Sequence, residues 1–186
     1  MNTYSIALFL HIVGALGFFV ALALEWTGLR QIRHATNIEQ LREWMRMINS
    51  TRRVGGPSAL LILITGFYMT VTARIGGAWI GVTLATLVLL IVVGAALTGP
   101  RMATIGKTLA NEQGSLSHNL QNLVNHPLLW ISIQTRVWIA LGIVFLMAVK
   151  PNLAGSLLAI GTAAIVGLAT ALPMPHHEQA QTGPAD

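Results

Sequence analysis

Three ionisable side chains lie inside stretches of the sequence that are otherwise apolar: His11, Glu25 and Arg136. An ionisable group within a membrane-spanning helix is costly to bury, so each of them is a candidate for function. The imidazole of His11 could ligate haem or a metal ion, because imidazole is a common ligand for both. Glu25 and Arg136 have opposite charges and could pair, either to lock two helices together or to move protons or ions.

The elements that must position these side chains are five apolar runs of about 20 residues, the length that crosses a bilayer. They occupy residues 4–24, 54–73, 79–98, 128–149 and 153–172. Of the 186 residues 54% are apolar and only 9% are charged, whereas soluble domains have about 25% charged residues. The sequence therefore predicts an all-α, polytopic bundle of five transmembrane helices, forming one domain (1–175) with a short C-terminal tail (176–186).

Breaks and loops set the expected limits of these spans. Gly55-Gly56-Pro57 is expected to break the chain at the start of the second span, and Gly99-Pro100 to end the third. In the first loop Thr36 and Glu39 have the spacing of a capping box. The apolar residues that follow recur at helical spacing and predict an amphipathic helix lying in the membrane interface: Ile38, Leu41, Met45 and Ile48.

Basic residues predict how the chain is oriented. They concentrate in the first and third loops, at Arg30, Arg33, Arg42, Arg46, Arg52, Arg53, Arg101 and Lys107. The positive-inside rule puts these loops and the C-terminus in the cytoplasm and the N-terminus outside, in a bacterial cytoplasmic (inner) membrane. The net charge of +5 is explained by basic residues that face the head groups of the lipid bilayer, which is the expected partner. No nucleic-acid partner is needed to explain this charge.

Within the spans, His11 lacks a second histidine that could complete a haem site. The candidate cofactor-binding residues that could supply the other ligand of a haem or metal ion are Met147, Tyr68 and Met69. If the first and fourth spans touch, Met147 falls near His11 and Arg136 near Glu25. Small residues after His11 leave room for a flat group or for a closely packed helix.

Small residues recur every four positions in the fifth span, at Gly155, Ala159, Ala163 and Gly167. Such a stripe lets two helix backbones approach closely. The partner could be another span of this chain, a second copy of the protein or another membrane subunit.

Several short segments resemble known families of small membrane proteins. They are Leu10-His11-Ile12-Val13-Gly14-Ala15, Arg52-Arg53-Val54-Gly55-Gly56-Pro57, Leu63-Ile64-Thr65-Gly66 and Met147-Ala148-Val149-Lys150-Pro151. In these segments the chain resembles small bacterial integral-membrane families that are known only as domains of unknown function. It is also distantly similar to the copper-resistance D family and the membrane-embedded protoporphyrinogen oxidases. The latter resemblance implies that His11 binds haem, although the lysine that those oxidases use within a later span has no counterpart here.

Three functions remain open from the sequence. The leading hypothesis is a haem- or metal-associated membrane protein, for redox chemistry or for haem or copper handling, with His11 as ligand. The second is a non-catalytic subunit or assembly factor of a larger membrane complex. The third is a small transporter or channel that uses Glu25 and Arg136. The sequence has no nucleotide-binding glycine loop, zincin motif or nucleophile elbow, and it leaves open whether the protein is an enzyme.

Overall fold

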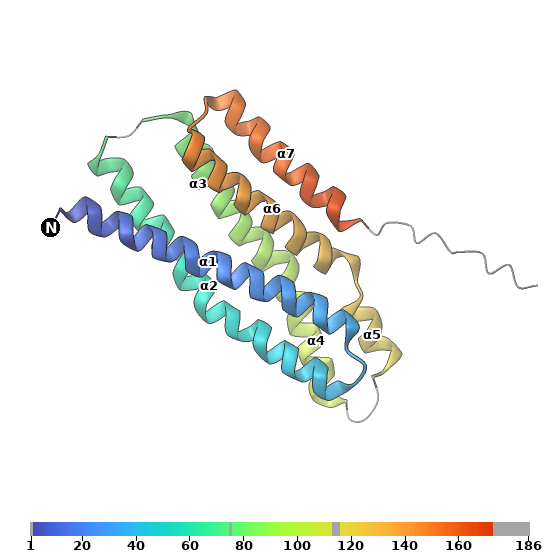
Figure 1. The fold of residues 1–186 in the computed structure, drawn as a ribbon. Coiled ribbons are helices and arrows are strands. Elements are labelled where there is room, and N and C mark those ends of the chain that lie inside the picture. Colours follow the sequence, from blue (N-terminus) through green and yellow to red (C-terminus); the bar gives the residue numbers. More distant parts are fainter. Residues whose placement is uncertain (1, 75, 113–115, 173–186) are drawn as a thin grey trace, which may run out of the picture.

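The computed structural model describes residues 2–74, 76–112 and 116–172, so the predicted tail at 176–186 lies outside the described residues. Figure 1 shows long helices packed side by side into one bundle. The helices are α1 (Thr3–His34), α2 (Ile38–Thr72), α3 (Ala78–Val93), the π-helix η1 (Gly94–Thr98), α4 (Gly99–Asn111), α5 (His118–Val124), α6 (Pro127–Val149) and α7 (Leu153–Ala171).

The prediction of an all-helical chain with five spans is confirmed. Five helical segments are long and apolar enough to cross a membrane: Thr3–His34, Ile38–Thr72, Ala78–Asn111, His118–Val149 and Leu153–Ala171. No strand occurs in the described ranges. The connection between α6 and α7 is short and these two helices pack against each other, as the sequence indicates. The connection between α2 and α3 is also short, but these two helices make at most slight contact.

The expected break at Gly55-Gly56-Pro57 is wrong, because α2 continues through it. A proline inside a helix removes one hydrogen bond, but membrane helices tolerate it where neighbours satisfy the freed backbone. Gly55, next to this proline motif, has a role in packing α2 against α1. A Cβ on Gly55 would lie 3.1 Å from the Cβ of Ala21, so the absence of a side chain lets α1 approach α2.

The expected stop at Gly99-Pro100 is also wrong. The helix changes hydrogen-bonding pattern at η1, where the N–H of Gly99 donates to the carbonyl of Gly94, and then continues as α4. Pro100 occupies the first turn of α4, where a missing N–H costs little. The helical segment therefore continues through Pro100, with the wider π-helical turn of η1 directly before it.

The amphipathic segment of the first loop is not a separate helix, because it forms the first part of α2. Its N-cap is Asn37, whose side chain accepts from the N–H of Gln40 at 2.9 Å, in place of the predicted pair of Thr36 and Glu39. The four apolar residues are all buried, and Ile48 contacts α1 at Gly28. The apolar face of this segment thus packs against other helices of the protein. In an amphipathic helix lying in the membrane interface, this face would instead contact lipid.

One end of the bundle carries most of the basic residues, and the hydrophobic core extends into it. The end of α1, the start of α2, α4 and α5 gather there (Figure 1). The third loop, between the predicted spans 79–98 and 128–149, is largely helical in its described residues, as α4 and α5. Side chains from all four elements are buried together: Leu29, Ile32, Leu41, Met45, Ile105, Leu109, Leu120 and Val124. The long helices therefore extend beyond the predicted spans into a packed cap.

The small-residue stripe of α7 packs against α6 of the same chain. A Cβ on Gly142 of α6 would lie 3.1 Å from the Cβ of Ala163, and one on Gly167 would lie 2.7 Å from the Cα of Thr135. Small residues on both helices allow this close approach. Of the partners left open by the sequence, a span of this chain is the one observed.

Candidate functional site

Glu25 of α1 and Arg136 of α6 form a bidentate ion pair, the contact expected if the first and fourth spans touch. Arg136 donates from Nη1 to Oε2 at 3.2 Å and from Nη2 to Oε1 at 2.5 Å. Their side chains are only 17% and 10% exposed. Two charges this deeply buried are tolerated when they pair and hydrogen-bond well.

The π-helix completes the surroundings of Arg136. Its Nη2 donates to the hydroxyl of Thr98 at 3.5 Å, and Thr98 is hydrogen-bonded to Ser132 of α6 at 3.2 Å. A Cβ at Gly94 would lie 2.8 Å from Nη1, so glycine at this position leaves room for the guanidinium where it is observed. Arg136 Nε is buried and has no hydrogen-bond partner among the described residues. Single π-helical turns occur frequently at functional sites, and this one borders an arginine with an unused donor.

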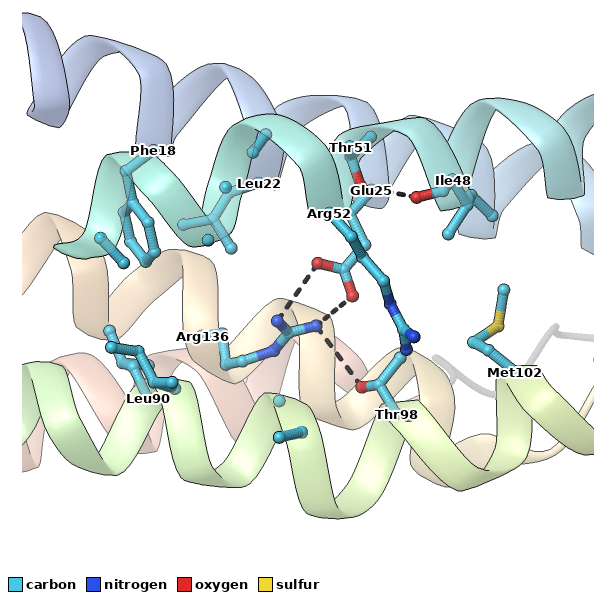
Figure 2. Close-up of a pocket in the computed structure, with 18 residues that line it drawn as sticks. Phe18, Leu22, Glu25, Ile48, Thr51, Arg52, Leu90, Thr98, Met102 and Arg136 are labelled. Atoms are coloured by element: carbon cyan, nitrogen blue, oxygen red, sulfur yellow. Dashed lines mark hydrogen bonds and ion pairs between the residues drawn. The ribbon is translucent and has the colours of Figure 1, made fainter. Parts of the chain in front are cut away.

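The ion pair borders a cavity of about 380 Å³ between α1 and α2 on one side and α3, η1 and α4 on the other. Figure 2 shows Arg136 and Glu25 meeting there, with Arg52 of α2 reaching across toward Thr98. The lining is Phe18, Ala21, Leu22, Glu25, Ile48, Thr51, Arg52, Gly55, Gly56, Ala59, Leu90, Ile91, Gly94, Ala95, Thr98, Gly99, Met102 and Arg136.

Arg52 gives the cavity a positive charge. The ion pairs formed by the described residues are Glu25–Arg136 and Glu39–Arg42, so Arg52 has no acidic partner among them. With Glu25 and Arg136 cancelling, one positive charge remains. Sequence reasoning counted Arg52 only as a loop residue that orients the chain. Because α2 is continuous, Arg52 shares a helix face with Gly55, Gly56 and Ala59, and this periodicity is the signal that could have found it.

His11 lies away from this cavity, between α1 and α2. Its Nδ1 is 3.0 Å from the hydroxyl of Thr65, and that hydroxyl donates to the carbonyl of Leu61 at 2.6 Å. With the hydroxyl proton directed to Leu61, the matching tautomer has the proton on Nδ1, which donates to Thr65 and leaves the Nε2 lone pair available. No described residue hydrogen-bonds to Nε2.

Among the described residues, the side-chain hydrogen bond of His11 is with Thr65 and not with the predicted companions Met147, Tyr68 and Met69. Thr65 is the hydrogen-bonding partner of His11, while Tyr68 is 40% exposed and Met147 packs against the core. Met69 is partly buried. The described residues contain no group of three or more His, Asp or Glu side chains that could hold a metal ion. The small residues after His11 serve a close helix, since a Cβ on Gly14 would lie 3.1 Å from Ile62 of α2.

Comparison of the sequence and fold with family models, curated proteins and solved structures found no match. The class of this protein therefore rests on the structure itself: an all-helical chain with five helices able to span a membrane and a charged cavity among them.

Proposed function

We propose that this protein is a small multi-pass transporter-type protein that binds an anionic ligand in the cavity beside Glu25 and Arg136. The observation that carries the proposal is Arg52, a cation without an acidic partner among the described residues, in the same cavity as a neutralised ion pair. A positively charged cavity with hydroxyl groups attracts a carboxylate or a phosphate, since arginine donors match both.

The surrounding helices suit a site that changes shape. The π-helix η1 borders Arg136 through Gly94 and Thr98. A change in its hydrogen-bonding pattern would shift these contacts and the position of the guanidinium. We place the protein in the bacterial cytoplasmic membrane with the basic end in the cytoplasm, following the distribution of arginine and lysine. The cavity then lies in the cytoplasmic half of the bilayer.

Replacement of Arg52 is expected to weaken anion binding about tenfold, because a charge-assisted hydrogen bond contributes about 1.5–3 kcal/mol. The measurement is calorimetric titration of the protein in a neutral detergent with inorganic phosphate and with octyl phosphate. Arg53→Gln is the matched control, since it removes the same charge from the next residue, which does not line the cavity. If neither probe binds, or if Arg52→Gln and Arg53→Gln bind alike, the proposal is wrong.

A second candidate function, haem or metal association through His11, is favoured by the hydrogen bond from Nδ1 to Thr65. A histidine ligand commonly donates its other ring N–H in this way, which fixes the ring and directs the free nitrogen to the metal. The resemblance to the protoporphyrinogen oxidases favours the same residue. The space beside Gly14 is filled by α2, so a haem would have to lie outside that interface, with its remaining ligand from elsewhere.

Under this second candidate, protein from cells supplied with haem and copper is expected to show a Soret band or stoichiometric copper. The signal should disappear in His11→Ala. Thr65→Val is the more selective variant, because it removes the acceptor of Nδ1 while keeping the imidazole, and we expect a shifted or weakened band. Colourless, copper-free wild-type protein would refute haem and copper binding and leave the proposal for the charged cavity unchanged.

The small-residue stripe of α7 gives the subunit hypothesis no separate support, because it is used within this chain. The stripe that could have bound another protein is covered by α6, where Gly142 and Gly167 make the close contacts.

A further inference from the structure

We infer that the ligand of the cavity is an anionic amphiphile that enters sideways from the membrane. Its phosphate or carboxylate head would lie beside Arg52, and the start of its chain among the apolar lining residues. This inference rests on the proposed function and names the class of ligand for the same site.

The cavity lining is divided between polar and apolar residues. Glu25, Arg52, Thr98 and Arg136 gather in one part, while Phe18, Leu22 and Leu90 lie beyond the ion pair, farther from the basic end (Figure 2). A small hydrated anion gains nothing from the apolar part. A molecule with a charged head and a hydrocarbon chain matches both parts, because each methylene transferred to apolar surroundings is favourable.

The cavity opens between α2 and the α3–η1 segment. Among the described residues α2 packs along α1 and against α4, and its packing against α3 is at most slight. The lining residues Gly56, Ile91 and Ala95 are exposed, and a Cβ on Gly56 would meet no atom within 4 Å. All three lie within candidate membrane spans. In a bilayer this opening therefore faces lipid chains, which gives an amphiphile a direct lateral path.

Aromatic residues place the polar part of the cavity near the level of lipid head groups. Trp26 directly follows Glu25, and its ring lies 5.9 Å from that of Trp130. The guanidinium of Arg33 lies 5.6 Å from the centroid of the Trp130 ring. Tryptophan with neighbouring arginine is typical of the membrane–water interface. A phospholipid phosphate at that level would need little displacement to reach Arg52.

The size of the cavity limits how much of the amphiphile it can hold. Ligand pockets in proteins have volumes of roughly 300–1,000 Å³, and this one has about 380 Å³. It accommodates a head group and the first methylenes of a chain. The rest of a diacyl lipid would stay in the bilayer outside the opening.

The test uses nanodiscs of phosphatidylcholine with or without phosphatidylglycerol of the same acyl chains. Native mass spectrometry after release is expected to find one phosphatidylglycerol per protein and no enrichment of phosphatidylcholine. Arg52→Gln should reduce this retention about tenfold, and Arg53→Gln should leave it unchanged.

Two further variants test the lateral opening. Gly56→Phe is expected to block lipid retention without disturbing the fold, because the site of the added side chain is open. Gly161→Phe is the matched control, since a Cβ there also meets no atom within 4 Å and Gly161 does not line the cavity. Retention that survives Gly56→Phe would refute lateral entry.

The outcomes separate this inference from the proposed function. If inorganic phosphate binds in an Arg52-dependent way and phosphatidylglycerol and octyl phosphate do not, the ligand is a soluble anion and the inference is overturned, while the proposed function stands. If none of the three probes binds, both fail.

Discussion

Arg136→Met is expected to destabilise the protein by about 3–5 kcal/mol, because it leaves the buried carboxylate of Glu25 without its partner. The carboxylate is only 17% exposed, and both of its oxygens accept from the guanidinium. The measurement is unfolding of the detergent-solubilised protein with increasing sodium dodecyl sulfate, followed by circular dichroism.

The double variant Glu25→Leu with Arg136→Met separates the cost of an unpaired charge from the value of the pair. Apolar replacement of both partners of a buried ion pair is often neutral or stabilising, so the double variant should recover most of the lost stability. A single variant as stable as the wild type would show that the ion pair is not buried as described.

Gly167→Val is expected to destabilise the packing of α7 against α6 by about 1–3 kcal/mol or more. An added Cβ would lie 2.7 Å from the Cα of Thr135 and 3.3 Å from the carbonyl of Gln134, so backbone must move. The same unfolding titration measures this effect.

Gly161→Val is the control for the α7 prediction. It makes the identical change in the same helix at a position where a Cβ meets no atom within 4 Å. We expect it to unfold within about 0.5 kcal/mol of the wild type. Equal behaviour of the two variants would mean that α7 does not pack through its small-residue stripe.

Much of the helix pattern is readable from the sequence because hydropathy alone defines it. The limits of α6 and α7 agree with the predicted spans to within one residue, since Pro127, Lys150 and Asn152 lie at their ends. Lys150 adopts a left-handed conformation (φ of 54°) that ends α6, and Asn152 caps α7. Local chemistry and hydropathy agree at these positions, so the prediction succeeds.

Local signals mislead where tertiary packing overrides them. Gly55-Gly56-Pro57 and Gly99-Pro100 are typical of helix ends, but both lie in continuous helical segments. Similarly, the apolar face that begins at Ile38 has the periodicity of an interfacial helix and packs instead within the protein. Hydropathy cannot distinguish burial in lipid from burial in protein, because both remove apolar surface from water.

The candidate site, like the fold, could be predicted from the sequence only in part. The pairing of Glu25 with Arg136 could be predicted because buried opposite charges must find each other. The contribution of Arg52 was missed, because its periodicity with Gly55 and Gly56 has meaning only when α2 is continuous through the Gly55-Gly56-Pro57 segment. The partner of His11 was also missed, because Thr65 is an ordinary helix residue until the packing of α1 and α2 is known.

The proposed preference of the cavity for anions can be measured directly, because the sequence contains no cysteine. In Ala95→Cys, a thiol lies in the lining of the cavity, whereas in Ala96→Cys it lies on an exposed neighbour outside it. We expect Ala95→Cys to react faster with a negatively charged methanethiosulfonate than with a positively charged one, and this preference to reverse when Arg52→Glu is added. Equal rates for the two reagents, or a preference for the cation in the presence of Arg52, would contradict an anion-binding cavity.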